Sequence, residues 1–480
     1  MATAYKTPGV YIEEIPKFPP SIAAVETAIP AFIGYTEIAK ELVDGDLHLK
    51  PKRISSMVEY ERFFGLPQNE EACIVTISTT GTAVATLDKS KRSRHLMYYS
   101  LQLFFANGGG PCYVISVGSY KSFSAGVPGI LVKNELNAGL LPLSKVDEPT
   151  LIIFPESQWL SISDYQSLHD AALLQCATLK DRFVIMDMHG DADGDADGGV
   201  DNSMFNAQAQ MNTAVTEFRT HGIGTGNLKY GAVYAPNVAT TLDYAYDESM
   251  TVVKINGTDK KLSELRAGSD VDSLNYERSK AALRDLECIL PPSGAIAGVY
   301  ARVDQERGVW KAPANVSLNA VVRPTIPLTD ADQETMNVDP TAGKSVNAIR
   351  SFTGKGTLIW GGRTLAGNDL EWRYINVRRT FIFIEESIKK ATEQFVFDPN
   401  DANTWVKVQA MIENFLTTLW RQGALQGVKP EHAFYVAVGL GKTMSAIDIL
   451  EGRLIIEIGL AVVRPAEFII LRFSHKMAQS

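Results

Sequence analysis

The middle of the chain alternates short apolar runs with longer segments of helical periodicity. Residues 151–155 and 182–188 form apolar runs, which are typical of strands covered on both faces. Residues 162–179 and 205–221 have the length and spacing of helices, and 231–236 is another short strand. This alternation predicts an α/β domain.

The segments on either side of this region also mix strands and helices. Asn256-Gly257 is a strong turn signal and predicts a polar hairpin over 246–266. Pro111 and the three glycines before it end a helix and lead into a strand. The further elements expected are strands within 21–36 and over 112–117, 357–362, 372–379 and 432–439, and helices within 53–66, 93–107 and 379–395.

A long amphipathic helix is expected over 401–422. Its apolar residues recur at i, i+3, i+7, i+10, i+11 and i+14, which is one stripe along a helix and ordinarily means core packing. These residues are Trp405, Val408, Ile412, Phe415, Leu416 and Leu419. The opposite side carries Lys407, Asn414, Thr418 and Arg421.

Both ends of the chain carry β-prone segments that proline isolates. Val10, Ile12 and, less regularly, Ile15 form a short alternating strand between prolines. At the other end, 454–463 and 468–473 are strand-like and are separated by Arg464-Pro465-Ala466-Glu467. A lone apolar strand leaves backbone groups unpaired. The two segments therefore either pair within their own subunit or add to sheets of neighbouring copies.

Composition excludes several classes of partner and compartment. The 480 residues suggest two to four domains, and 45% hydrophobic with 21% charged residues is ordinary for a globular protein. A formal charge of -9 argues against nucleic acid or an anionic membrane as the main partner. No signal peptide or transmembrane run of 18 apolar residues is recognisable, so no membrane insertion is expected.

Cysteine usage points to a reducing compartment. Cys73, Cys112, Cys176 and Cys288 lie far apart, without the close ligand pairs of a zinc site. We expect four buried, reduced thiols, which fits assembly in a bacterial cytoplasm.

Three sequence features invite a chemical interpretation. Gly439-Leu440-Gly441-Lys442-Thr443 resembles part of a phosphate loop, but Val436 occupies the position of its first glycine, so a turn is the better interpretation.

The acidic stretch near residue 195 is the second feature. It matches several positions of a calcium loop through Asp193, Asp195, Asp197 and Asp201, but Met204 stands where the bidentate glutamate belongs. A solvated loop is the main interpretation and weak calcium binding the alternative. The third feature is histidine: His189, His221 and His475 have no recognised nucleophile motif nearby, so no catalytic residue and no cofactor are predicted.

Six segments, in order along the chain, resemble contractile-tail sheath proteins. They are 7–15 (TPGVYIEEI), 104–117 (FFANGGGPCYVISV), 301–315 (ARVDQERGVWKAPAN), 347–365 (NAIRSFTGKGTLIWGGRTL), 397–408 (FDPNDANTWVKV) and 463–473 (VRPAEFIILRF). Residues 120–285 match weakly, and this region varies in the family. The length and compact middle slightly favour an extracellular contractile injection system over a phage.

This resemblance implies a structural subunit and not an enzyme. Sheath subunits stack as hexameric rings around an inner tube, link through exchanged terminal arms, and contract to drive the tube through a cell envelope. The implied partners are copies of the chain itself, the inner tube protein, and baseplate and terminal cap proteins, without direct contact to nucleic acid. The particle would be a virion tail or a released extracellular assembly.

The resemblance also implies a multi-domain α+β and α/β architecture. We expect an N-terminal arm (1–20), a first part of the core (21–120), an outer variable α/β domain (121–346), a tube-proximal domain (347–453) and a C-terminal arm (454–480). The arm residues that would contact other copies are Val10, Ile12, Ile15, Ile469, Leu471 and Phe473.

Tube contact belongs to the C-terminal body in this family. Lys407, Asn414, Thr418 and Arg421 are therefore candidates to face the tube, with a solvated polar face as the alternative. A non-contractile filament or capsid protein and a cytoplasmic nucleotide-binding enzyme are the competing functions.

Overall fold

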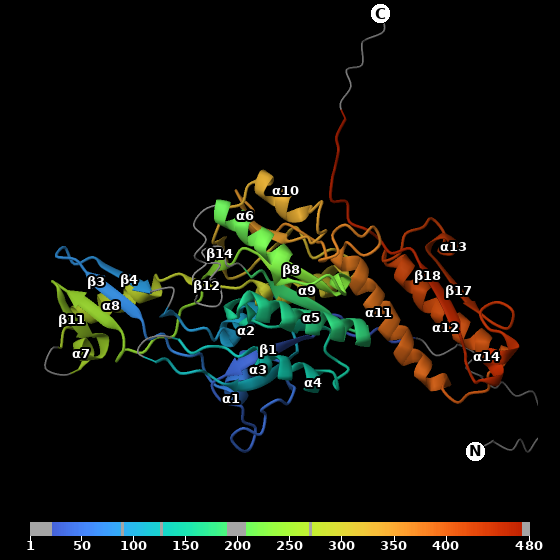
Figure 1. The fold of residues 1–480 in the computed structure, drawn as a ribbon, viewed down its shortest axis with the longest axis horizontal. Helices are drawn as coiled ribbons and strands as arrows, with labels where there is room; N and C mark the ends of the chain where they lie inside the picture. The colour runs from blue at the N-terminus through green and yellow to red at the C-terminus, as the bar shows by residue number, and fades with distance from the viewer. Residues whose placement is uncertain (1–21, 88–90, 125–127, 190–207, 268–270, 473–480) are drawn as a thin grey trace, which may run out of the picture. The chain divides into compact units, whose positions relative to one another are not determined.

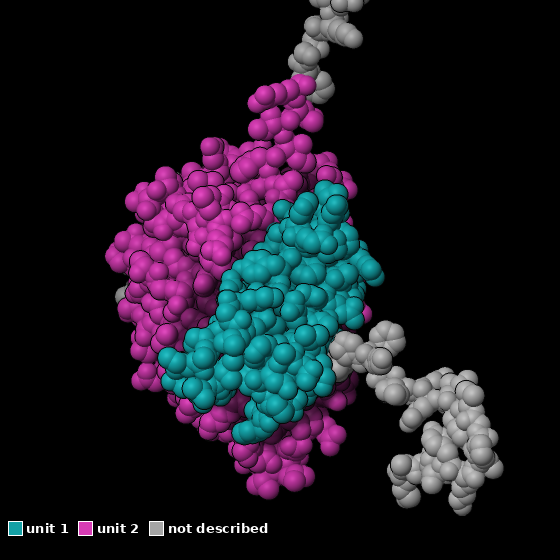
Figure 2. All heavy atoms as spheres, turned by 90° about the vertical axis from the view of Figure 1, so that its right-hand side faces the viewer, with its two compact units in different colours: residues 1–24, 385–463 teal, residues 25–384, 464–480 magenta. Residues whose placement is uncertain are grey.

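The computed structural model describes residues 22–472, apart from 88–90, 125–127, 190–207 and 268–270 (Figure 1). The chain divides into two compact units, coloured separately in Figure 2. Unit 1 contains Glu385–Val463 and the residues up to Ala24. Unit 2 contains Val25–Ile384 and the residues from Arg464 onward. Strands and helices alternate through both units, which confirms the predicted mixed α/β class.

A nine-stranded sheet forms the centre of unit 2. Its order is β13-β16-β15-β8-β7-β6-β1-β5-β2. The strands are β1 Pro30–Thr36, β2 Lys52–Ile54, β5 Cys112–Ser119, β6 Leu151–Ile153, β7 Phe183–Asp187, β8 Gly231–Ala235, β13 Val316–Ser317, β15 Asn347–Phe352 and β16 Gly356–Ile359. The run from β15 to β5 is parallel, and antiparallel strands close both sides. Strands β1, β6, β7 and β8 are buried at every residue, which explains their continuous apolar sequences.

Helices from distant parts of the sequence cover this sheet. Among those that pack on it are α2 Met97–Ala106, α5 Ile162–Leu179 and α9 Ser293–Arg307. Helix α9 lies against α2 at two glycines, because a Cβ on Gly294 or Gly298 would collide with backbone carbonyl oxygens of α2. Unit 2 also contains the helices α1 Met57–Phe64, α3 Lys133–Ala138, α4 Leu140–Leu143, α6 Gln208–Glu217 with a π-helical turn Phe218–Gly222, and α10 Asp330–Asn337.

The predicted hairpin forms part of a second, smaller sheet with its own core. Strands β10 Val252–Ile255 and β11 Thr258–Lys261 turn at Asn256-Gly257, both with positive φ. They join β3 Cys73–Ile77 and β4 Ala83–Leu87, and α7 Leu262–Arg266 and α8 Ser273–Arg284 complete this part. A third sheet contains β12 Cys288–Leu290, β9 Val238–Thr240 and β14 Val321–Pro324.

Unit 1 is built on the predicted amphipathic helix. Helix α12 Ala402–Arg421 begins at Asp401, whose side chain caps it by accepting a bond from the Thr404 N–H. It packs against β17 Phe434–Val438, which pairs antiparallel with β18 Ile456–Leu460. Short helices α13 Pro430–Ala433 and α14 Ala446–Leu450 lie beside these strands in the sequence, and α11 Ile375–Thr392 enters this unit from unit 2.

The structure corrects the predicted strand over 372–379. Residues from Ile375 onward are the first turns of α11. Residues 375–380 are all buried although Asn376, Arg378, Arg379 and Thr380 are polar, so apolar and polar residues do not separate onto two faces there. The β-prone residues Trp372, Tyr374, Ile375 and Val377 therefore imitated a strand.

The structure also divides the chain at other places than expected. The expected boundaries at 120 and 346 both cut the nine-stranded sheet, because strands on either side of each boundary belong to it. The described contacts place 347–384 in unit 2 and begin the second body at Glu385.

Candidate assembly interface

Within the expected C-terminal arm, Ile456–Leu460 is paired in unit 1, whereas the described residues 468–472 are exposed. Strand β18 pairs with β17 of its own unit over all five residues. Residues 461–463 continue this attachment through bonds from the Ala461 N–H to the Ala433 oxygen and from the Val463 N–H to the Ala424 oxygen. The expected arm over 454–480 is therefore paired within its own subunit over Ile456–Leu460, which is the alternative that the sequence left open.

The segment Arg464–Arg472 exposes four consecutive large apolar side chains. Phe468, Ile469, Ile470 and Leu471 are 71–79% exposed. The predicted strand over 468–473 is not formed in the described residues, which are drawn as an extended trace in Figure 1. Phe473 lies outside them. Apolar groups this exposed in sequence are a site for association.

Glu467 holds the start of this segment. Its carboxylate accepts bonds from Arg363 Nη2 at 2.6 Å, Asn337 Nδ2 at 2.7 Å and the Tyr374 hydroxyl at 3.2 Å. Burial alone would raise the pKa of Glu467, but these donors outweigh it and lower that pKa. The exposed apolar residues thus begin directly after a fixed carboxylate.

The two-stranded sheet of unit 1 leaves an edge on each strand. Among the described residues, β17 and β18 have only each other as strand neighbours. The Tyr435 ring lies against Gly459 of the opposite strand, where a Cβ would collide with it, and its hydroxyl bonds the Glu457 carboxylate at 2.6 Å. A strand edge without a partner strand is the kind of site at which a further strand adds through its backbone groups.

Helix α12 has the two faces that the sequence predicted. Val408, Ile412, Phe415, Leu416 and Leu419 are buried. Trp405 is half-buried, and its indole N–H donates to Asn400 Oδ1 at 2.7 Å. The four residues of the opposite face, Lys407, Asn414, Thr418 and Arg421, are all exposed. The structure brings them to one side of the helix, and what this side contacts stays a prediction.

Exposed apolar residues elsewhere in unit 1 were not foreseen. Phe397 is fully exposed, and Leu450 and Val428 are 86% and 89% exposed. Phe397 also has a left-handed φ of 73°. In the sequence, these residues stand out only because they lie outside the segments with helix or strand periodicity. That position does not distinguish an interface from an ordinary loop.

The N-terminal segment is fixed at Thr27. The Thr27 hydroxyl donates to Asp304 Oδ2 at 2.6 Å, and its carbonyl accepts from Arg379 Nη2 at 2.9 Å. Arg379 and Asp304 form a buried two-bond ion pair. The predicted arm residues Val10, Ile12 and Ile15 lie outside the described residues, so their contacts stay a prediction.

The candidate phosphate loop is closed on itself. The N–H groups of Lys442, Thr443 and Met444 all bond the Gly439 oxygen, and the Gly439 N–H bonds the Thr443 hydroxyl. A phosphate cradle needs such donors free. The turn interpretation of the sequence therefore agrees with the structure.

The other candidate chemistries gain no support. Asp193, Asp195, Asp197 and Asp201 fall outside the described residues. Within the described part of the chain, no three His, Cys, Asp or Glu side chains gather as a metal site would require. None of the helices there is both long and apolar enough to span a membrane.

Comparison with known proteins identifies the family. Residues 368–476 match the family model of the phage tail sheath C-terminal domain. The chain is 30% identical to the helical sheath of the anti-feeding prophage in its contracted state, over 98% of this chain and 100% of that one, with a TM-score of 0.61. The chain belongs to the contractile tail sheath family. A sheath of the extracellular contractile injection system PVC, also contracted, is 28% identical over 99% of both chains, with a TM-score of 0.64.

Curated phage relatives match a smaller part of the chain. The tail sheath protein of Burkholderia phage BcepMu is 29% identical over 230 residues. That alignment covers 46% of this sheath chain and 46% of the relative, so the chain spans about half the length of the curated relatives it matches.

Proposed function

We propose that this chain is the structural subunit of a contractile sheath and not an enzyme. Its subunits stack as hexameric rings around an inner tube and contract to drive that tube through a target envelope. The observation that carries this proposal is the exposed apolar run Phe468–Leu471 in a chain that aligns along nearly its whole length with a contracted sheath. The near-complete coverage of two injection-system sheaths supports a released extracellular particle over a phage virion.

Strand exchange is the proposed link between subunits. The C-terminal segment of one copy, from Phe468 onward, adds to a free edge of the β17–β18 sheet in another. Backbone bonds supply the attachment, and the apolar side chains Ile469 and Leu471 project on one side of the added strand. The N-terminal segment, with Val10, Ile12 and Ile15, makes a second link of the same kind.

The exposed face of α12 is the proposed contact with the inner tube. Lys407 and Arg421 supply cationic contacts that are individually weak and salt-sensitive. Weak contacts suit a surface that must release during contraction. Baseplate and cap proteins would bind the two ends of the sheath, after assembly in the bacterial cytoplasm.

Negative-stain microscopy of terminal deletions tests the proposal. We expect the full chain to form hollow striated tubes, and variants lacking residues 1–16 or 468–480 to remain folded but to form no long tubes. Circular dichroism checks that each variant is folded. Normal contractile tubes from both deletions would refute the strand-exchange link, and monomers of the full chain in every salt condition would refute the sheath function.

A non-contractile filament protein is the second candidate, because it would also use exposed terminal segments. Tubes of one fixed diameter, unchanged by any treatment, would favour it.

A further inference from the structure

Glu467 lies at the boundary between the part of the C-terminal segment that is hydrogen-bonded to unit 2 and the exposed residues that follow it. Glu467 has three side-chain partners, and its side chain is 20% exposed. Beyond it, 468–472 are all exposed. Glu467 is therefore the last of the described residues that side-chain contacts attach to the central part of unit 2.

Arg363, the main partner of Glu467, is itself fixed to the central sheet. Its side chain is 5% exposed. The Arg363 N–H donates to Asn347 Oδ1 at 2.9 Å, and Asn347 Nδ2 donates to the Arg363 oxygen at 2.8 Å. Asn347 is the first residue of β15 and also donates to the Val233 oxygen of β8. The backbone of Arg363, from which the side chain projects, is therefore held on two neighbouring strands of the nine-stranded sheet.

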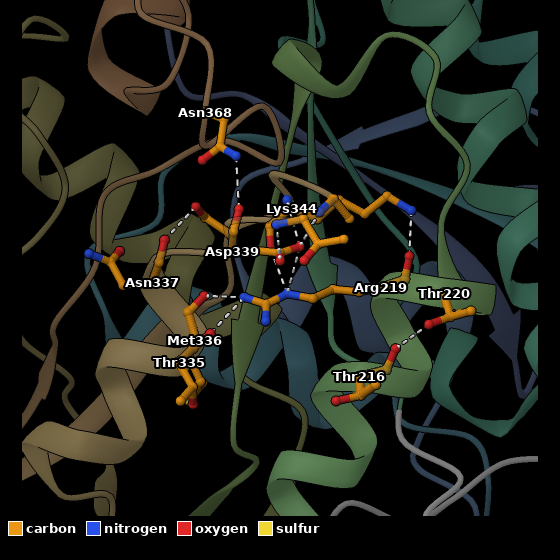
Figure 3. A network of polar contacts seen from close by, with 12 residues as sticks. Thr216, Arg219, Thr220, Thr335, Met336, Asn337, Asp339, Lys344 and Asn368 are labelled. Carbon is orange, nitrogen blue, oxygen red and sulfur yellow. Dashed lines mark hydrogen bonds and ion pairs between the residues drawn. The ribbon is translucent and has the colours of Figure 1, made fainter.

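Asn337 connects the same carboxylate to a second set of polar contacts. It ends α10, and its carbonyl accepts the Ser345 hydroxyl at 2.6 Å. Figure 3 shows Asn337 beside Asp339, whose carboxylate lies 3.5 Å from Arg219 Nε. Arg219 in turn donates to the carbonyl oxygens of Thr335 and Met336, at the end of α10. The end of α10 thus has little freedom to move.

A fixed starting point matters for a short segment. Five extended residues beyond Glu467 span roughly 16 Å. A strand that must pair with a neighbouring sheet in one register gains from a fixed direction, since ordering a free chain opposes binding. A rigid attachment also transmits force on the segment to the central sheet.

We propose that Glu467 is a positioning residue that anchors the C-terminal segment through Arg363, Asn337 and Tyr374 and presents it to a second copy of the chain. This inference rests on the proposed strand exchange. The anchor connects that segment to unit 2, whereas the strand before it, β18, belongs to unit 1. Movement of unit 2 during contraction would therefore move the exchanged strand with it.

Spin-label distances in the unassembled full chain measure the anchor directly. Labels on Ile470→Cys and Leu370→Cys can be placed selectively, because the four native cysteines are buried and Ile470 and Leu370 are exposed. We expect a narrow distance distribution that broadens at least twofold in Glu467→Gln. The matched control is Glu451→Gln, which removes an exposed ion pair with Arg453 in unit 1 and should leave the distribution unchanged.

Tube formation by unlabelled chains then distinguishes the role of the Glu467 anchor from the role of the exposed segment 468–480. Glu467→Gln should raise the critical concentration for tube formation at least tenfold. It also leaves the buried guanidinium of Arg363 without its carboxylate partner, so its unfolding temperature should fall, and assembly is compared at a temperature where circular dichroism shows both proteins folded. Arg363→Lys, which keeps the charge but loses the two-bond fork, should give an intermediate increase. An unchanged critical concentration for Glu467→Gln, with or without broadening, overturns the positioning role. If the deletion of 468–480 abolishes tubes while Glu467→Gln forms them normally, the strand exchange stands and only the anchor fails.

Discussion

Asp304→Asn removes one charge from a deeply buried ion pair that is joined by two bonds. Arg379 and Asp304 side chains are 3% and 5% exposed, and their atoms are joined at 2.9 Å and 2.5 Å. Burial alone would lower the pKa of Arg379, but Asp304 outweighs it and raises that pKa. The guanidinium therefore stays charged and loses its counterion in the variant.

The expected loss in the free energy of unfolding follows from the burial of this ion pair. Removing one partner of a buried pair typically costs about 3–5 kcal/mol, because the other charge is left uncompensated. Asp304 also accepts the Thr27 hydroxyl. Thr27→Ala removes only that neutral donor and should cost about 1 kcal/mol. Both variants loosen the point where the N-terminal segment leaves unit 2.

Urea unfolding of the unassembled chain measures the free-energy loss in Asp304→Asn and in Thr27→Ala. The transition of unit 2 can be followed by tryptophan fluorescence, since four of the six tryptophans (Trp159, Trp310, Trp360 and Trp372) lie in that unit. We expect the free energy of unfolding to fall about three times more in Asp304→Asn than in Thr27→Ala. A loss below about 1 kcal/mol for Asp304→Asn would refute the argument that the buried charge needs its partner.

Three further predictions address other parts of the chain. Lys407→Glu with Arg421→Glu should weaken co-sedimentation with the inner tube but not sheath self-assembly, and equal loss of both would count against this face. Leu416→Ala should cost unit 1 about 2–5 kcal/mol in urea unfolding, because its side chain is fully buried; a loss under 1 kcal/mol would contradict its place in that core. Burial raises the pKa of Glu70 from 4.5 to about 7. Between these two pH values the folded chain keeps a proton on Glu70 that the unfolded chain loses. The free energy of unfolding should therefore fall by roughly 3 kcal/mol as the pH rises from 4.5 to about 7. Glu70→Gln should flatten this fall, and an unchanged pH profile would contradict it.

The sequence predicted the elements whose pattern reflects simple burial. Helix α12 and its apolar stripe were correct, because one face packs on a sheet and the other meets solvent. Strands β6, β7 and β8 were found because burial on both faces gives them short apolar runs. The same burial concealed the start of α11, where polar residues are buried beside apolar ones and no single polar face marks the helix.

Pairing at the C-terminus could not be predicted from the sequence. Strand β18 and the segment after Glu467 are both apolar and β-prone, but one has a partner in β17 and the other has none among the described residues. Likewise the anchor depends on Arg363, Asn337 and Tyr374, which lie 93–130 residues away from Glu467. Contacts over such separations leave no local pattern.

Cryo-electron microscopy of tubes assembled from the full chain tests the central claim most directly. The account predicts continuous density in which Phe468–Leu471 of one subunit forms a strand against β17 or β18 of another. Density showing that segment paired within its own subunit, with no strand added to the β17–β18 sheet from a neighbour, would contradict it.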